Sequence, residues 1–563
     1  MKNDKVIGQS SKADTSCQLA NLFRVGNLSK IEIENLTYLG KIWGFLKYYH
    51  PAVGNGKFDW DTELLRVLPK VIAANSKTSF SDIMENWLDG LGQVGVCQTC
   101  SITIKSDGSN KLMPDFNWII SGNTLNKSLV KKLKYIIENR HQGEGYYIAV
   151  SNSGNAVFSN ENGYESSHYP GDKYRLLALF RYWNIIQYYF PYKYLIGEDW
   201  NKILPEFIPK FIAAKDSIQY VLACQELVVR IHDSHASVWE NKILEEYRGK
   251  YFPLVQTRFI EGELVVTGYY MDTLNIKKQI KIGDVVKSID GQEVKTLIDK
   301  YLYLTNGSNY EVQLRNLPLR PLMRSQKPNL DLVVTRGEKI FKINVKNVYL
   351  DSLYRNDDYY STPADTSYKL INGNIGYVFA GKYKNEQLEN IKRYFESTKG
   401  MIIDLRHYPN DIMPYTFGAF IKAHSTPFAK LTRVDLDAPG HFSLEDPLVN
   451  GEENKNCYQR RIVIIVNSET QSQGEFTTMA LQSSPNVIVI GSKTSGADGN
   501  YSSIVLPGGI LTWFSGKGVY YPDGSETQRV GVKIDLKVYP TIKGIKAGRD
   551  ELVEKAIEII NKS

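Results

Sequence analysis

Apolar residues at helical spacing occur in two stretches of the chain that repeat one another. Trp43 and Trp183 are 140 positions apart, and so are Trp60 and Trp200. A Tyr-Tyr pair shortly before a proline follows the first tryptophan of each pair, and a Pro-Lys step leading into apolar residues follows the second. A fixed offset without gaps indicates a duplicated unit. We therefore expect two related helical units along the first 250 residues.

The two copies differ at their ends. The second copy ends in His232-Asp233-Ser234-His235, whereas the first has Gly92-Gln93-Val94-Gly95 at the same offset. Only the second copy carries ionisable side chains there. If this segment takes part in chemistry, only the second copy does so.

The remaining pattern divides the chain further. Short strands with turns, including a tight Asp290-Gly291 turn, follow the second copy. From residue 370 onward, expected strands (374–378, 401–405, 461–466, 487–490) alternate with expected helices (385–397, 474–483, 550–561), which is typical of an α/β fold. The expected parts are a flexible N-terminal tail (1–30), a first helical repeat (31–100), a mixed connecting segment with a helix around 124–140 (101–170), a second helical repeat (171–250), a strand-rich segment (251–350) and an α/β core (351–563).

Composition narrows the class of protein. Apolar residues make up 42% and charged residues 23%, and the net charge of +7 is small for this length, without the Lys/Arg block of a nucleic-acid-binding protein. No apolar run is long enough for a membrane span. The polar start lacks the apolar stretch of a signal peptide. We expect an exported protein, in the periplasm or cell envelope, whose signal has been removed; a cytoplasmic protein is the alternative.

The five cysteines are too few for a disulfide scaffold. Cys97-Gln-Thr-Cys100 has the spacing of a redox or zinc pair, but the sequence has no second pair to complete a zinc site. We expect two small residues entering a strand, with a local disulfide as the alternative in an exported protein.

A candidate nucleophile follows the expected strand 461–466. Ser472 lies in the turn between this strand and a helix that begins near Gly474. A side chain at such a turn is exposed above the strand ends, and the N–H groups at the helix start can stabilise an anion, as acyl transfer requires. The same residues are also compatible with a Ser/Gln-rich loop that only caps the helix.

This segment resembles the nucleophile motif of the C-terminal processing (tail-specific) proteases, in which a strand ending in Val-Asn precedes a serine placed three residues before an acidic residue, here Ser472 and Glu475. Asp404-Leu405-Arg406 similarly matches the family's strand end before the oxyanion loop. Residues 282–294 resemble the second half of a PDZ domain, without an evident carboxylate-binding loop upstream. The resemblance covers 171–563 and implies a crotonase/ClpP-like peptidase core with an inserted PDZ-like domain.

The sequence departs from the family at two places. The loop 407–411 lacks the usual Gly-Gly, and Pro409 has no N–H to donate. We therefore expect the backbone N–H groups of Asn410 and Gln473 to bind the oxyanion. The family's general-base lysine is absent from 494–499, and the nearby Lys493 is expected to be a solvated residue at a strand end.

A second branch, similar to the core of tricorn protease, uses a Ser-His pair before the PDZ domain and a glutamate after the nucleophile. Ser234, His235 and Glu526 occupy these positions. The resemblance implies that His235 is the general base and acid and that Ser234 and Glu526 orient it. Asp523 and Glu475 are alternatives to Glu526 as the orienting carboxylate. For His235, the alternatives to a general base are a metal ligand together with His232 or a surface histidine without a role.

These features predict a serine endopeptidase that acts on peptides or unfolded proteins without metal or cofactor and binds no nucleic acid. An inactive binding module for hydrophobic ligands or peptides is the chief alternative, because interphotoreceptor retinoid-binding protein repeats resemble these peptidases. A scaffold built on the helical repeats is a third. Substrate sequence and oligomeric state stay open, a homo-oligomer included.

Overall fold

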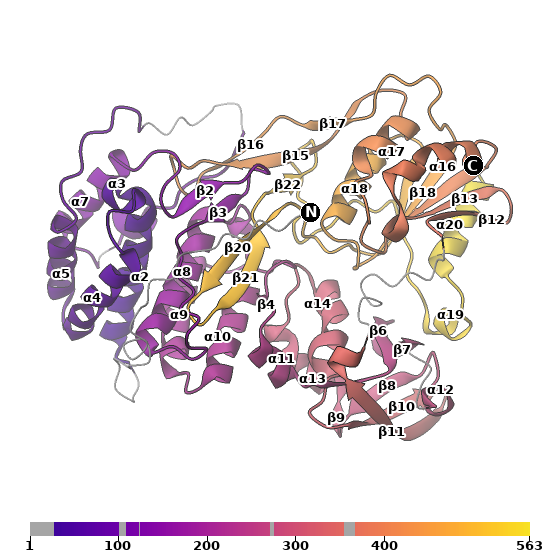
Figure 1. Ribbon diagram of the computed structural model, residues 1–563, viewed down its shortest axis with the longest axis horizontal. Coiled ribbons are helices and arrows are strands. Elements are labelled where there is room, and N and C mark those ends of the chain that lie inside the picture. Colours follow the sequence, from indigo (N-terminus) through magenta and orange to yellow (C-terminus); the bar gives the residue numbers. More distant parts are fainter. Residues whose placement is uncertain (1–27, 101–108, 123, 271–274, 354–365) are drawn as a thin grey trace.

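The computed structural model describes residues 28–100, 109–122, 124–270, 275–353 and 366–563. Figure 1 shows a helical half at one side, an α/β core at the other, and a strand-rich unit below the core. Separate clusters of buried apolar side chains fill the three regions. Within these residues no helix has the length and apolar character needed to cross a bilayer. Most of the predicted N-terminal tail lies outside the described residues.

Two sets of three helices form the helical half. The first set is α2 (Lys30–Tyr49), α4 (Trp60–Ala73) and α5 (Lys77–Asp89), and the second is α8 (Asp172–Tyr189), α9 (Trp200–Ala213) and α10 (Ser217–Val229). The second and third helices of the two sets keep the 140-residue offset at both ends. Short helices and turns complete this half: α3 (Pro51–Gly54), α6 (Asn117–Ile120), α7 (Lys127–Glu138), η1 (Lys193–Leu195) and α11 (Lys242–Arg248).

A reciprocal tryptophan pair holds each set together. The indole N–H of Trp43 donates to the carbonyl of Trp60, and that of Trp60 donates to the carbonyl of Trp43, both at 3.0 Å. Trp183 and Trp200 exchange the same two bonds at 2.8 and 3.1 Å. All four side chains are buried, so each indole N–H needs such an acceptor. The repeated pattern in the sequence therefore corresponds to a repeated packing unit.

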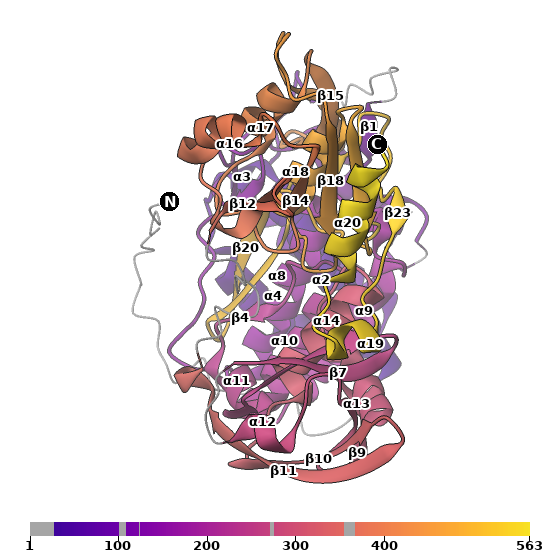
Figure 2. The ribbon, with the colours of Figure 1, turned by 90° about the vertical axis from the view of Figure 1, so that its right-hand side faces the viewer.

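The strand-rich unit is an antiparallel sheet with its own core. Its strand order is β5-β11-β10-β8-β7-β6, with β9 paired to β8. The strands are β5 (Tyr251–Pro253), β6 (Val255–Ile260), β7 (Glu263–Tyr269), β8 (Val285–Ile289), β9 (Gln292–Glu293), β10 (Asn329–Arg336) and β11 (Lys339–Tyr349). Its helices and turns are α12 (Ile276–Gln279), α13 (Val294–Tyr301), η2 (Leu302–Leu304), α14 (Tyr310–Leu317), η3 (Pro318–Leu322) and η4 (Leu350–Ser352). Figure 2 shows β11 at the outer margin of this unit.

The α/β core is built on a six-stranded sheet in the order β12-β13-β14-β18-β19-β23, parallel except for β12. The strands are β12 (Tyr368–Ile371), β13 (Ile375–Phe379), β14 (Gly400–Asp404), β18 (Arg461–Val466), β19 (Val487–Gly491) and β23 (Leu536–Lys537). Around it lie η5 (Ala380–Lys382), η6 (Asn385–Gln387), α16 (Leu388–Phe395), α17 (Pro414–Ile421), α18 (Gln473–Gln482), α19 (Ile542–Lys546) and α20 (Glu551–Asn561). Alternate residues of the central strands pack into two different apolar clusters, so both faces are buried. The α/β class and the expected strands and helices of this region are confirmed.

Two further sheets connect the core to the helical half. One is formed by β1 (Asn110–Leu112), β15 (Thr426–Val434), β16 (Phe442–Leu444), β17 (Leu448–Asn450) and β22 (Val519–Tyr520). The other pairs the hairpin of β20 (Tyr501–Leu506) and β21 (Ile510–Ser515) with β4 (Val238–Trp239), beside the small sheet of β2 (Ile148–Val150) and β3 (Ala156–Phe158). Ile504 and Phe514 of this hairpin pack in the apolar cluster of the helical half. The end of the second helical repeat is thereby brought to the core.

Cys97 and Cys100 form a disulfide. The alternative of a local bridge is therefore the one that the structure contains, and the expected entry into a strand falls on residues 101–108, outside the described residues.

Candidate active site

The turn at the C-terminal end of β18 carries Ser472 in an unusual backbone conformation. Its φ of 52° and ψ of −118° lie in a region that residues with a side chain seldom occupy, and α18 begins at the next residue. The N–H of Ser472 donates to the carbonyl of Ala497 at 3.0 Å. Such a strained residue must be held by its surroundings, and strain of this kind is concentrated at functional sites. The serine is therefore presented at a helix start by a sharp strand-to-helix turn.

The buried carboxyl group of Glu475 connects this turn to the loop after β19. It accepts hydrogen bonds from the Thr494 hydroxyl at 2.5 Å and from the N–H groups of Gly496 and Ala497 at 2.7 and 3.0 Å. Burial raises the pKa of Glu475, while these hydrogen bonds oppose the rise. Glu475 thus holds in place the loop whose carbonyl receives the Ser472 N–H.

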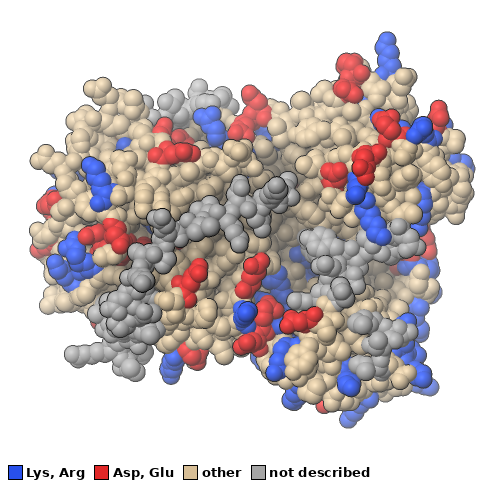
Figure 3. All heavy atoms as spheres, viewed as in Figure 1, with Lys and Arg blue, Asp and Glu red and all other residues tan. Residues whose placement is uncertain are grey.

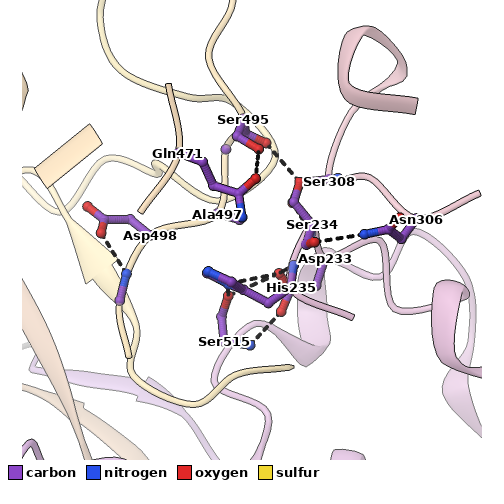
Figure 4. A network of polar contacts seen from close by, with 12 residues as sticks. Asp233, Ser234, His235, Asn306, Ser308, Gln471, Ser495, Ala497, Asp498 and Ser515 are labelled. Carbon is purple, nitrogen blue, oxygen red and sulfur yellow. Dashed lines mark hydrogen bonds and ion pairs between the residues drawn. The ribbon is translucent and has the colours of Figure 1, made fainter. Parts of the chain in front are cut away.

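His235 is oriented by Asp233 and Ser515. Nδ1 of His235 lies 2.9 Å from the Ser515 hydroxyl, which donates to Oδ1 of Asp233 at 3.0 Å. The backbone N–H groups of His235 and Ser515 also donate to this carboxylate, at 3.0 and 2.5 Å. Burial alone would raise the pKa of Asp233, but its interactions with His235 and the Ser515 N–H hold that pKa below its ordinary value. In Figure 4 the opposite edge of the ring faces the side on which Ala497 and Asp498 lie.

Ser234 binds the nucleophile loop region rather than the ring of His235. Its hydroxyl lies 3.0 Å from that of Ser308 and 3.3 Å from the Ser495 carbonyl. Ser495 in turn donates through its hydroxyl to Gln471 at 2.8 Å and through its N–H to the Thr470 carbonyl at 2.9 Å. The Ser234-His235 pair and the turn of Ser472 are therefore joined through Ser495, as the polar network in Figure 4 shows.

Glu526 does not occupy the orienting position that the resemblance implies. Its Oε1 accepts hydrogen bonds from Lys111 at 2.7 Å and from the Tyr194 hydroxyl at 2.8 Å. The carboxylate next to Nδ1 of His235 is instead Asp233, at 3.6 Å. Asp233 and Ser515 are the residues that the sequence analysis missed, and the Asp-Ser-His order was the one local signal for the first of them.

The two expected oxyanion donors differ in whether their backbone N–H group already has an acceptor. The N–H of Asn410 donates to the Ala380 carbonyl at 3.0 Å, so in this conformation it already has an acceptor. Gln473 is the first residue of α18, where the helix itself supplies no acceptor for the N–H. Its side chain donates to the Asp411 carbonyl at 2.8 Å and ties the helix start to the loop that should carry the second donor.

A second buried carboxyl group, that of Asp498, lies on the loop after β19, next to Ala497. Its Oδ1 accepts the N–H of Gly499 at 2.6 Å, and its Oδ2 has no hydrogen-bond partner among the described residues. Burial, and then the nearby Glu475, raise the pKa of Asp498 well above its ordinary value. This side chain therefore favours the neutral form.

A cavity of about 800 Å³ separates the strand-rich unit from the core, with β6, α14 and the stretch around 539–552 among its walls. Arg315 of α14 reaches across to the nucleophile loop and hydrogen-bonds the Ser468 carbonyl at 2.5 Å and the Gln471 side chain at 3.2 Å. The strand-rich unit is thus in direct contact with the segment that carries Ser472.

Comparisons with known proteins place the core in a family of peptidase domains. Residues 374–538 match the model of peptidase family S41, so the core contains a peptidase S41 domain, and this match supports a serine-type peptidase role. No curated protein sequence matches the chain.

Several solved structures match the chain at low sequence identity, and the first of them shares its fold. Mature CPAF complexed with lactacystin has a TM-score of 0.54 and 13% identity, and the match covers 70% of this chain and 99% of that chain. The photosystem II D1 C-terminal processing protease has a TM-score of 0.38 and 14% identity, covering 65% and 92%. Tricorn protease has a TM-score of 0.34 and 15% identity, covering 69% and 37%.

Proposed function

We propose that the chain is a serine endopeptidase in which Ser472 is the nucleophile and His235 the general base. The observation that carries the proposal is the hydrogen-bonded chain from Asp233 through Ser515 to His235, whose neighbour Ser234 is joined through Ser495 to the strained turn of Ser472. An imidazole that is backed by a carboxylate and can reach a serine hydroxyl is the arrangement that activates serine for acyl transfer.

The proposed reaction has two stages. The Ser472 oxygen forms a bond to the scissile carbonyl carbon while its proton passes to Nε2 of His235. Collapse of the tetrahedral intermediate breaks the C–N bond, and His235 gives the proton to the leaving amine. Water then repeats the sequence on the acyl-enzyme and releases the acid. The N–H of Gln473 at the start of α18 is the proposed oxyanion donor, and a second donor requires the 407–411 loop to move.

The sequence-based assignments of the other site residues change accordingly. Ser234 is proposed to fix the position of His235 through its bonds to Ser308 and Ser495 rather than through the ring. Glu526 is not included in the catalytic group, because its Oε1 is bound by Lys111 and Tyr194 and no contact of the carboxylate with His235 is present among the described residues.

The substrates are proposed to be peptides or unfolded proteins, and residues 251–350 a PDZ-like domain that contributes to their recognition. The antiparallel sheet with a separate core, and the free edge of β6 along the cavity, support this role.

We also propose the six-part domain division that the sequence predicts, in which the core is a crotonase/ClpP-like domain. On the face shown in Figure 3, basic and acidic side chains are interspersed, unlike the continuous basic stripe of a nucleic-acid-binding surface.

A serine-directed fluorophosphonate probe tests the proposal. The wild-type protein should be labelled at Ser472, and labelling should be lost in Ser472→Ala and strongly reduced in His235→Ala. A folded wild-type protein that is not labelled would favour the inactive binding module instead. The occupied N–H of Asn410 is the observation that supports this second candidate.

A further inference from the structure

Three aromatic side chains form a continuous strip on the sheet that positions His235. Tyr501 of β20 stacks on Trp513 of β21 with ring centroids 4.7 Å apart and planes at 25°. Trp513 stacks in turn on Trp239 of β4, at 5.0 Å and 24°. We call these three residues the aromatic strip. The guanidinium of Arg320 lies 5.0 Å above the Trp239 ring and closes the far end.

The register of the strands explains why the strip faces outward. Tyr501 pairs with Ser515 and Leu511 pairs with Trp239, so these residues lie on the same face as Trp513. The intervening residues of the strands point the other way, into the buried core of the helical half. Tyr501 is 49% exposed, and the two tryptophans are half-buried. Stacked rings with exposed area on one sheet face leave an apolar surface that is open to a ligand.

The strip begins at the proposed general base. The Tyr501 ring centroid lies 6.4 Å from that of His235, and the indole N–H of Trp239 donates to the His235 carbonyl at 2.9 Å. Ser515, whose hydroxyl binds Nδ1 of His235, belongs to the same face of the sheet. Figure 1 shows β4, β20 and β21 in the middle of the molecule, between the helical half and the core. The open apolar surface is therefore continuous with the candidate active site.

We propose that the aromatic strip is the substrate-specificity site of the peptidase and takes large apolar or aromatic side chains of the polypeptide near the cleaved bond. The inference rests on the proposed function. An extended chain advances about 3.3 Å per residue, so Tyr501 and Trp513 would meet side chains roughly two to four residues from that bond. Such side chains are buried in folded proteins and become accessible on unfolding. The strip thus selects unfolded chains because it binds the large apolar side chains that unfolding makes accessible.

Binding to the inactive Ser472→Ala protein tests the strip without requiring catalysis. The probes are two end-labelled peptides of equal length, one rich in phenylalanine and one with each phenylalanine replaced by serine. Fluorescence anisotropy should show at least about tenfold tighter binding of the phenylalanine peptide, because each stacked aromatic contributes substantially to a contact. Adding Trp513→Ala should remove this preference, and Trp513→Phe should largely retain it.

Tyr394→Ala is the matched control, because Tyr394 is also an exposed tyrosine beside another aromatic ring, 51% exposed and 5.8 Å from Tyr368, but lies on α16 of the core. It should leave the preference intact. Tyr501→Ala, at a half-exposed position, gives the same test if Trp513→Ala does not fold. Equal binding of both peptides by Ser472→Ala, or an unchanged preference in folded strip variants, would overturn the inference. Probe labelling of Ser472 in the Trp513→Ala protein reports separately on the proposed function.

Discussion

The hydroxyl oxygen of Ser515 accepts a hydrogen bond from the Nδ1–H group of His235. A hydroxyl has one proton, and that of Ser515 is donated to the Asp233 carboxylate. The short contact between Ser515 and Nδ1 of His235 is then a hydrogen bond from the ring to the hydroxyl oxygen. The neutral ring is consequently the tautomer with a proton on Nδ1 and a lone pair on Nε2, which is the form that a general base requires.

Asp233→Asn should lower kcat/KM for a peptide substrate by at least about 10², because the amide cannot stabilise the charged ring and does not enforce this tautomer. Steady-state cleavage, together with a thermal melt to verify folding, measures the effect. Glu526→Gln is the control and should change kcat/KM by no more than a few-fold. The reverse ranking of the two variants would restore the glutamate assignment made from the sequence.

His235→Ala should lower cleavage by about 10² to 10⁴, the range typical for loss of a general base. Lys493→Ala should have little effect, since the proposed proton acceptor is the ring of His235. The rate of fluorophosphonate labelling and the rate of peptide cleavage should fall together in the histidine variant. Full activity in His235→Ala, or its loss in a folded Lys493→Ala protein, would point to a Ser/Lys dyad.

Glu475→Gln should reduce both stability and activity although Glu475 is not proposed to touch the substrate. The carboxyl group accepts three hydrogen bonds from the 494–497 loop, and an amide presents an NH₂ group to some of these donors. We expect a lower melting temperature and a fall of about tenfold in kcat, with KM little changed. Glu469→Gln, in the turn that precedes α18, is a control that should keep kcat near the wild-type value.

Asp498→Asn should stabilise the protein at neutral pH. The folded-state pKa of Asp498 is raised, so the folded protein binds a proton more tightly than the unfolded chain does. Stability is then lost as the pH rises from the unfolded value of about 3.9 toward the folded one. The gain in melting temperature of Asp498→Asn over wild type should therefore be largest near neutral pH and shrink toward pH 4.

Asp523→Asn is the matched control for this pH series. Hydrogen bonds from Ser525 lower the pKa of Asp523 to about 2, so its stabilising contribution is present above the unfolded value and is lost only as the pH falls toward 2. Its effect should be destabilising and constant between pH 5 and 8. A melting-temperature difference for Asp498→Asn that does not vary with pH would contradict the assignment of a neutral carboxyl group.

The sequence predicted those parts of the structure that depend on local patterns. The apolar run at 461–466 is a strand with these bounds, and the tryptophans at a fixed offset correspond to two equivalent helix sets. The role of Ser515 could not be predicted, because it depends on a contact with His235 across 280 residues. Glu526 has the expected place in the sequence, but the bridge between Tyr520 and Glu526 turns it toward Lys111 and Tyr194.

The hairpin of β20 and β21 also has a consequence for the order of events during synthesis. It packs in the helical half, and its last residue completes the surroundings of a histidine made 280 residues earlier. A growing chain folds from its N-terminus, so its helical units form while the hairpin has not yet been translated. The surroundings of His235 therefore stay incomplete on the ribosome until residues 501–515 have been translated and have packed against the helical half.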